Sequence, residues 1–112
     1  MRTIICGGRD YYLTSDDYAF LDSIKGKITR VISGGAKGAD RCGEEWAKRN
    51  GILVRVIESE WSLFGKQADY KRNVAMSEIA DAVVVFPGGK GTQTMFDIAK
   101  KKKLQIWDRR VD

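Results

Sequence analysis

The sequence contains no histidine. This absence excludes Ser-His-Asp and Cys-His nucleophilic catalysis, and it removes the side chain that most often binds transition metals. Cysteine is scarce: the two cysteines, Cys6 and Cys42, lack C-x-x-C spacing, so neither a zinc site nor a redox motif is indicated. We expect two buried free thiols and no bound metal.

Long hydrophobic runs are also missing. No apolar stretch approaches the roughly 20 residues that cross a membrane, and the N-terminal MRTIICGGRD reaches glycine too soon for a signal peptide. We therefore expect a cytoplasmic protein with no membrane partner. The 112 residues are 43% hydrophobic and 31% charged, which is typical of one globular domain over residues 1–112.

Positive charge is in modest excess, with a net charge of +5 from 20 Lys and Arg against 15 Asp and Glu. Four of the cations form the run Lys100–Lys103, where a helix is expected to end and where cations favour the helix dipole. No aromatic residues are interleaved with this run. Nucleic-acid binding therefore stays open as an alternative that the pattern does not favour.

Residues 82–99 read AVVVFPGGKGTQTMFDIA and combine a strand signal with a helix signal. Ala82–Phe86 is short, apolar and rich in β-branched residues, which is typical of a strand buried on both faces of a parallel sheet. Pro87 ends this strand because it has no N–H to donate to a neighbour. Apolar residues at helical spacing predict a helix from Thr92.

The glycine-rich turn between this strand and helix predicts an anion site. Free N–H groups at a helix N-terminus point outward, and the helix dipole favours negative charge, so phosphate is the expected ligand. The alternative is that the glycines only make a tight turn. The residues predicted to bind phosphate here are Pro87, Gly88, Gly89, Lys90, Gly91 and Thr92.

Strand and helix patterns alternate along the whole chain. Ser15 is expected to cap a helix, Gly51 to end another in the left-handed conformation, and Glu58–Gly65, with Trp61 and Phe64, to be irregular. The expected strands are Arg2–Cys6, Thr29–Ser33, Leu53–Ile57, Ala82–Phe86 and Leu104–Trp107. The expected helices are Asp16–Lys25, Ala39–Asn50, Lys66–Ala80 and Thr92–Lys102.

This alternation predicts an α/β fold: a Rossmann-like doubly wound parallel sheet of about five strands with helices on both faces. Right-handed crossovers place every strand-to-helix turn at the carboxyl edge of the sheet. With the order 3-2-1-4-5, strands one and four are neighbours at the switch point, where ligands bind. Two more glycine turns lie on this rim, and their predicted ligand-binding residues are Gly7, Gly8, Arg9, Asp10, Gly34, Gly35, Lys37 and Gly38.

Two common phosphate-binding motifs are absent. A Walker loop requires Ser or Thr after Gly-Lys, but the three Gly-Lys pairs are followed by Ile28, Gln67 and Gly91. No G-x-G-x-x-G follows the first strand, and no acidic residue ends the second. These patterns argue against an NTPase and against use of NAD, and no cofactor is predicted.

The predicted helix Lys66–Ala80 carries polar residues that a core helix does not need. Lys66, Tyr70 and Asn73 are spaced to share one face, which is also the pattern of a solvated amphipathic helix. Arg72 has a fork of donors suited to phosphate or ribose. Asp10 and Asp40 follow two of the glycine turns, as helix caps or as acceptors for ribose hydroxyls.

Motifs along nearly the whole chain resemble a known superfamily. The run Arg72-Asn73-Val74-Ala75-Met76, followed by AVVVFPGGKGT, resembles the R-K-x-x-M … PGG-x-GT-x-x-E signature of LOG-type phosphoribohydrolases. The motifs GGRD, GGAKGAD-R…WA and PGG-x-GT-x-x-M resemble more closely the small YspA or cpYpsA-related group of the SLOG superfamily. This resemblance implies a Rossmann-like fold with a nucleotide or nucleotide-derived ligand on the glycine rim.

The chain departs from the LOG-type signature at two positions. The glutamate that assists N-glycosidic cleavage in those enzymes is replaced by Met95, which can neither stabilise oxocarbenium charge nor move a proton. Met95 is expected in the core, with Asp97 on nearly the opposite side of the helix. Arg72 matches the family's arginine, whereas Asn73 replaces its usual lysine.

These observations predict a protein that binds a nucleotide-derived ligand as a sensor, carrier or sequestering protein. One alternative is a phosphoribohydrolase or transferase that uses Asp10, Asp40 or Glu44 as its carboxylate. A second is a nucleic-acid-associated protein, in line with a distant resemblance of SLOG domains to DNA-processing proteins. The family's habit of pairing subunits further implies a homo-oligomer, a dimer or higher.

Overall fold

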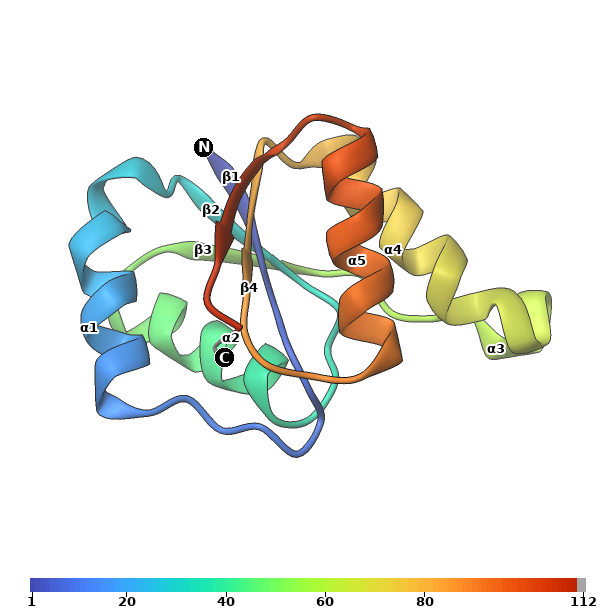
Figure 1. Ribbon diagram of the computed structural model, residues 1–112, viewed down its shortest axis with the longest axis horizontal. Coiled ribbons are helices and arrows are strands. Elements are labelled where there is room, and N and C mark those ends of the chain that lie inside the picture. The colour runs from blue at the N-terminus through green and yellow to red at the C-terminus, as the bar shows by residue number, and fades with distance from the viewer. Residues whose placement is uncertain (111–112) are drawn as a thin grey trace.

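The structure is a computed structural model that describes residues 1–110 (Figure 1). The strands are β1 (Arg2–Cys6), β2 (Arg30–Ser33), β3 (Leu53–Val56), β4 (Ala82–Val85) and β5 (Gln105–Asp108). The helices are α1 (Ser15–Ile24), α2 (Ala39–Arg49), α3 (Trp61–Phe64), α4 (Ala68–Ile79) and α5 (Lys90–Lys101), with 3-10 turns η1 (Lys25–Lys27) and η2 (Gly65–Gln67). None of the helices within residues 1–110 has the length and apolarity that a membrane span requires.

All five strands are parallel and are ordered β3-β2-β1-β4-β5. The predicted Rossmann-like sheet and its strand order are confirmed. β1 lies between β2 and β4, with Ile4 in register with Ile32 on one side and with Val83 on the other. β1 is thus the central strand, and the switch point of the sheet lies between the carboxyl ends of β1 and β4.

Helices cover both faces of the sheet, and side chains from β1 and β4 alternate between the two layers (Figure 1). Ile5 and Val84 pack against α1 and α2, whereas Ile4, Cys6 and Val85 pack against α4 and α5. This alternation follows from the two-residue period of a strand. It also places Cys6, the last residue of β1, on the side of α4 and α5.

Four element predictions needed correction, one of them the start of α5, which lies at Lys90 rather than Thr92. The N-cap of α1 is Thr14 rather than Ser15, because Thr14 and Asp17 form a capping box: the Asp17 N–H donates to Thr14 Oγ1 (3.2 Å), and the Thr14 N–H donates to Asp17 Oδ2 (3.0 Å). The segment predicted to be irregular contains α3. The following helix begins at Ala68 instead of Lys66, because Gly65–Gln67 is a 3-10 turn.

Candidate functional site at the glycine rim

The three glycine turns meet at the carboxyl ends of β1, β2 and β4, where two cavities adjoin. The first, here called the rim cavity, has a volume of about 520 Å³, within the usual range for small-molecule sites. The second cavity, about 680 Å³, lies over the turn at residues 34–38. The two cavities share Arg9, Ala36, Trp61, Asp69 and Arg72 in their walls.

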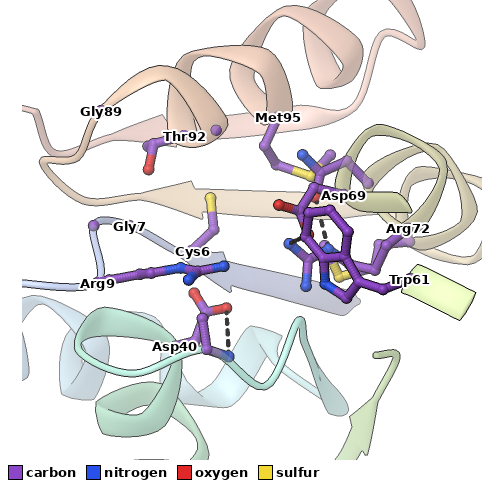
Figure 2. Close-up of a pocket in the computed structure, with 15 residues that line it drawn as sticks. Cys6, Gly7, Arg9, Asp40, Trp61, Asp69, Arg72, Gly89, Thr92 and Met95 are labelled. Carbon is purple, nitrogen blue, oxygen red and sulfur yellow. Dashed lines mark hydrogen bonds and ion pairs between the residues drawn. The ribbon is translucent and has the colours of Figure 1, made fainter. Parts of the chain in front are cut away.

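The turn after β4 opens into the rim cavity, which is lined by Gly89, Gly91 and Thr92 (Figure 2). α5 begins at Lys90 after the N-cap residue Gly89, and no side chain caps it. The N–H groups of its first turn therefore have no acceptor within the helix. Within residues 1–110 the Thr92 hydroxyl makes no hydrogen bond either, so this end of α5 presents unused donors.

Close backbone contacts lock the first glycine turn to the other two. The Gly8 N–H donates to the Pro87 carbonyl (2.8 Å), and the Gly8 carbonyl accepts the N–H of Ala39 (3.2 Å), the first residue of α2. A Cβ at Gly88 would lie 2.6 Å from the Gly8 nitrogen, and one at Gly7 would lie 2.6 Å from the Ala39 Cβ. Glycine is thus required at both positions by close approach of the turns.

The turn at residues 34–38 reverses the chain with two residues in positive φ, Gly35 at 75° and Gly38 at 73°. The Gly35 N–H donates to Ser33 Oγ (3.1 Å) and the Ala36 N–H to Asp40 Oδ2 (3.3 Å). Lys37 is exposed and lines the second cavity, so this turn presents a positive side chain there.

Arg72, on α4, lines both cavities, but each of its three side-chain nitrogens already faces a protein acceptor. Nη1 donates to the Gly34 carbonyl (2.8 Å), Nε donates to Asn73 Oδ1 (3.0 Å), and Nη2 lies 3.6 Å from Asp69 Oδ1. Asn73 itself is buried. Arg72 therefore joins α4 to the second glycine turn, 38 residues away in sequence, and brings positive charge to the cavity wall.

Asp40 is a buried carboxylate in the wall of the rim cavity, with 6% of its surface exposed. Burial, with a smaller contribution from the nearby Glu44 charge, raises its pKa to about 6 against the lowering effects of the Ala36 N–H and the Arg72 charge. In Figure 2 the side chains of Arg9 and Asp40 point toward each other beneath Cys6. Burial, together with the Asp40 charge, also raises the pKa of the Cys6 thiol. The thiol therefore stays protonated, and a protonated thiol is unreactive.

The three candidate carboxylates do not converge on one cavity. Asp40 lines the rim cavity, Asp10 is exposed beside the second, and Glu44 lines a third cavity of about 460 Å³ near Lys48. Glu44 is buried, and its Oε2 accepts the Ser33 hydroxyl (2.6 Å). The structure thus leaves Asp40 as the one member of this trio in contact with the rim cavity.

Met95 is buried in the core between the sheet and α5, as predicted, and its side chain also lines the rim cavity (Figure 2). Asp97 is exposed, and its Oδ1 accepts the Gln93 amide (2.8 Å). The position that holds a glutamate in LOG-type enzymes therefore faces the cavity here with a thioether. Among residues 1–110, no group of three His, Cys, Asp or Glu side chains is arranged to hold a metal ion.

The face predicted from Lys66, Tyr70 and Asn73 is wrong for the first two residues, whereas Asn73 lines the rim cavity. Lys66 lies in η2, before the helix, so the helical spacing does not extend back to it, and Tyr70 is exposed. Neither residue lines the rim cavity or the second cavity. The residues of the rim cavity that sequence reasoning did not select are Cys6, Ala36, Trp61, Asp69 and Met76.

Four of those missed residues carried a usable signal: Ala36 lies inside the second glycine turn, and Met76 ends the signature run that begins at Arg72. Cys6 is the last residue of the strand that precedes a predicted ligand turn, a place where side chains reach the switch point. Asp69 stands three residues before Arg72, the spacing of a helical ion pair. Trp61 carried no comparable signal, because it lies in a segment without periodicity.

Comparison with known proteins agrees with the fold. A family model described as the YspA, cpYpsA-related SLOG family matches residues 1–64. Gene 61 protein of Mycobacterium phage D29 is 28% identical over 117 residues, covering 94% of this chain and 91% of the phage protein. The X-ray structure of DNA processing protein A (DprA) from Streptococcus pneumoniae has a TM-score of 0.72 at 12% identity, over 96% of this chain. The chain spans 49% of that DprA chain, and the likeness is one of fold.

Proposed function

Because the chain belongs to the YspA, cpYpsA-related SLOG family, we propose that it binds a nucleotide or nucleotide-derived phosphorylated ligand, as a sensor, carrier or sequestering protein. One observation carries the proposal: the uncapped N-terminus of α5 opens into a cavity of about 520 Å³ at the switch point of the sheet. Backbone donors and the helix dipole at such a place favour an anion.

In this proposal the phosphate lies against the first turn of α5, with the Thr92 hydroxyl as a further donor. Arg9 and Arg72 supply positive charge from the walls that the two cavities share. Lys37 and Arg41 line the second cavity and extend this charge outward. The contacts among the three turns hold the donors in place before ligand binds, which lowers the entropic cost of binding.

Replacing Gly89 tests the phosphate site without disturbing the core. A Cβ at Gly89 meets no atom within 4 Å and its φ is −99°, so valine fits the fold while its branches crowd the first turn of α5. We expect Gly89→Val to weaken binding of nucleoside monophosphates by at least about tenfold in calorimetric titration.

Gly26→Val is the matched control, since a Cβ there also meets nothing within 4 Å and Gly26 lines neither cavity. Unchanged affinity in Gly89→Val, or equal loss in both variants, would contradict the assignment. Steep salt-dependent affinity for DNA in a protein that binds no nucleotide would favour the nucleic-acid-associated alternative.

A phosphoribohydrolase or transferase is the second candidate, and the position of Asp40 favours it. A carboxyl group with a pKa of about 6 in a cavity is suited to proton transfer near neutral pH. With Met95 in place of the glutamate, we nevertheless expect no release of free base or ribose phosphate from nucleoside monophosphates above background, measured by chromatography. If the unaltered protein released these products robustly and Asp40→Asn abolished the release, the enzyme candidate would replace the binding role.

We also propose that the 112 residues form a single domain and that the chain assembles as a homo-oligomer. Sedimentation equilibrium checks the second statement: a mass near 12.6 kDa at all concentrations would contradict it.

A further inference from the structure

Trp61 is placed unlike the other two tryptophans. Trp46 is 2% exposed and its indole N–H donates to Asp22 Oδ1 (2.9 Å), and Trp107 packs against the core under α1 and α2. Trp61 is 54% exposed and belongs to neither core cluster. Within the part of the chain that the structure describes, its indole N–H makes no hydrogen bond. Packing therefore does not explain a large aromatic ring at this position.

The ring lies where the two cavities meet. Trp61 lines both the rim cavity and the second cavity, and Figure 2 shows its ring extending from α3 beside Asp69 and Arg72. Thr92, at the proposed phosphate site, lies on a different side of the same cavity. Leu63, on the same short helix, is 67% exposed but lines neither cavity.

We propose that Trp61 stacks on the base of the nucleotide whose phosphate lies at the N-terminus of α5. This inference rests on the proposed function and deepens it by assigning the base end of the site. A half-exposed indole offers a flat π-surface that any base can cover, and ring stacking of this kind is largely indifferent to the base. The ligand is then a nucleotide with its base intact, held at one end by backbone donors and at the other by an aromatic face.

Titration of Trp61→Ala and Trp61→Phe with two kinds of probe tests the proposal. The probes are the four common nucleoside monophosphates, which carry a base, and ribose 5-phosphate, which carries none. We expect Trp61→Ala to weaken nucleotide binding by about 5- to 150-fold and ribose 5-phosphate binding by less than about twofold. Trp61→Phe retains most of the affinity, and Leu63→Ala, the control on the same helix, binds like the unaltered protein.

Fluorescence gives an independent readout. A stacked base quenches the indole, so nucleotide should quench the emission of the unaltered protein, and Trp61→Phe should abolish the quenching although Trp46 and Trp107 remain. Circular dichroism and thermal melting confirm that each variant is folded.

The outcomes separate this inference from the proposed function. If neither nucleotides nor ribose 5-phosphate bind, the proposed function fails and this inference fails with it. If both probes bind equally well, or if Trp61→Ala weakens both equally or neither, the stacking role is overturned while the phosphate site stands.

Discussion

Arg72 is the residue where fold and ligand binding are hardest to separate. Its guanidinium donates to Gly34 and Asn73 and lies beside Asp69, yet it also faces both cavities. Removing it leaves buried acceptors without donors, which costs about 1–3 kcal/mol for each group. The effect of a substitution at Arg72 must therefore be measured on the free energy of unfolding as well as on ligand affinity.

We expect Arg72→Ala to lower the free energy of unfolding and to weaken binding of a nucleoside monophosphate far more than binding of the matching nucleoside. The second effect follows because bonds from a guanidinium to phosphate are charge-assisted. Urea unfolding and calorimetric titration with both ligands measure the two effects. Equal losses for nucleotide and nucleoside would show that Arg72 serves the fold or the base instead of the phosphate.

Asp40, in the wall of the rim cavity, makes the stability of the protein depend on pH. Its pKa of about 6 lies above the ordinary value of 3.8, so the folded state holds the proton more tightly than the unfolded state does. The tighter proton binding by Asp40 in the folded state therefore stabilises the fold. This stabilisation is fully present below about pH 3.8 and is lost as the pH rises through about 6.

We expect Asp40→Asn to gain stability relative to the unaltered protein as the pH rises from 4 to 7.5, by up to about 3 kcal/mol. Urea unfolding of both proteins across this range measures the difference. Asp81 and Asp108, whose pKa values are lowered by Arg2 and Arg110, titrate alike in both proteins and cancel. A difference independent of pH would contradict the raised pKa.

At the scale of elements, α2 and α5 end in the same way with different residues. In α2 the Gly51 N–H donates to the Lys48 carbonyl (3.2 Å) and the Ile52 N–H to the Ala47 carbonyl (2.8 Å), with Gly51 at a φ of 68°. In α5, Lys103 at a φ of 61° takes the place of that glycine. Both ends are Schellman motifs, and a lysine in the left-handed conformation carries a steric cost.

We expect Lys103→Gly to raise the free energy of unfolding by about 0.5–1 kcal/mol, because glycine adopts this conformation without the Cβ clash. Gly51→Ala is the reciprocal variant and should lower it by a similar amount. Denaturant unfolding with an unchanged m-value measures both. A loss of stability in Lys103→Gly would contradict the strain and would point to a role for the lysine charge at the helix end.

At the scale of the whole molecule, the sheet order and the three converging turns were predictable because alternating strand and helix patterns leave few topologies. The core position of Met95 and the left-handed Gly51 followed equally from local pattern. What the sequence did not reveal depends on contacts between distant segments. The Arg72 bond to Gly34 and the placing of Trp61 over two cavities arise only when α3 and α4 pack near the second turn.

The most direct measurement is an amide NMR titration of the ¹⁵N-labelled protein with the four nucleoside monophosphates and with inorganic phosphate. A phosphate held by α5 should produce saturable shifts in the N–H signals of residues 88–92 that exceed those of the exposed lysine run 100–103 at the other end of the helix. Shifts confined to that lysine run, or no saturable shift at residues 88–92 with any of these probes, would contradict the proposed site.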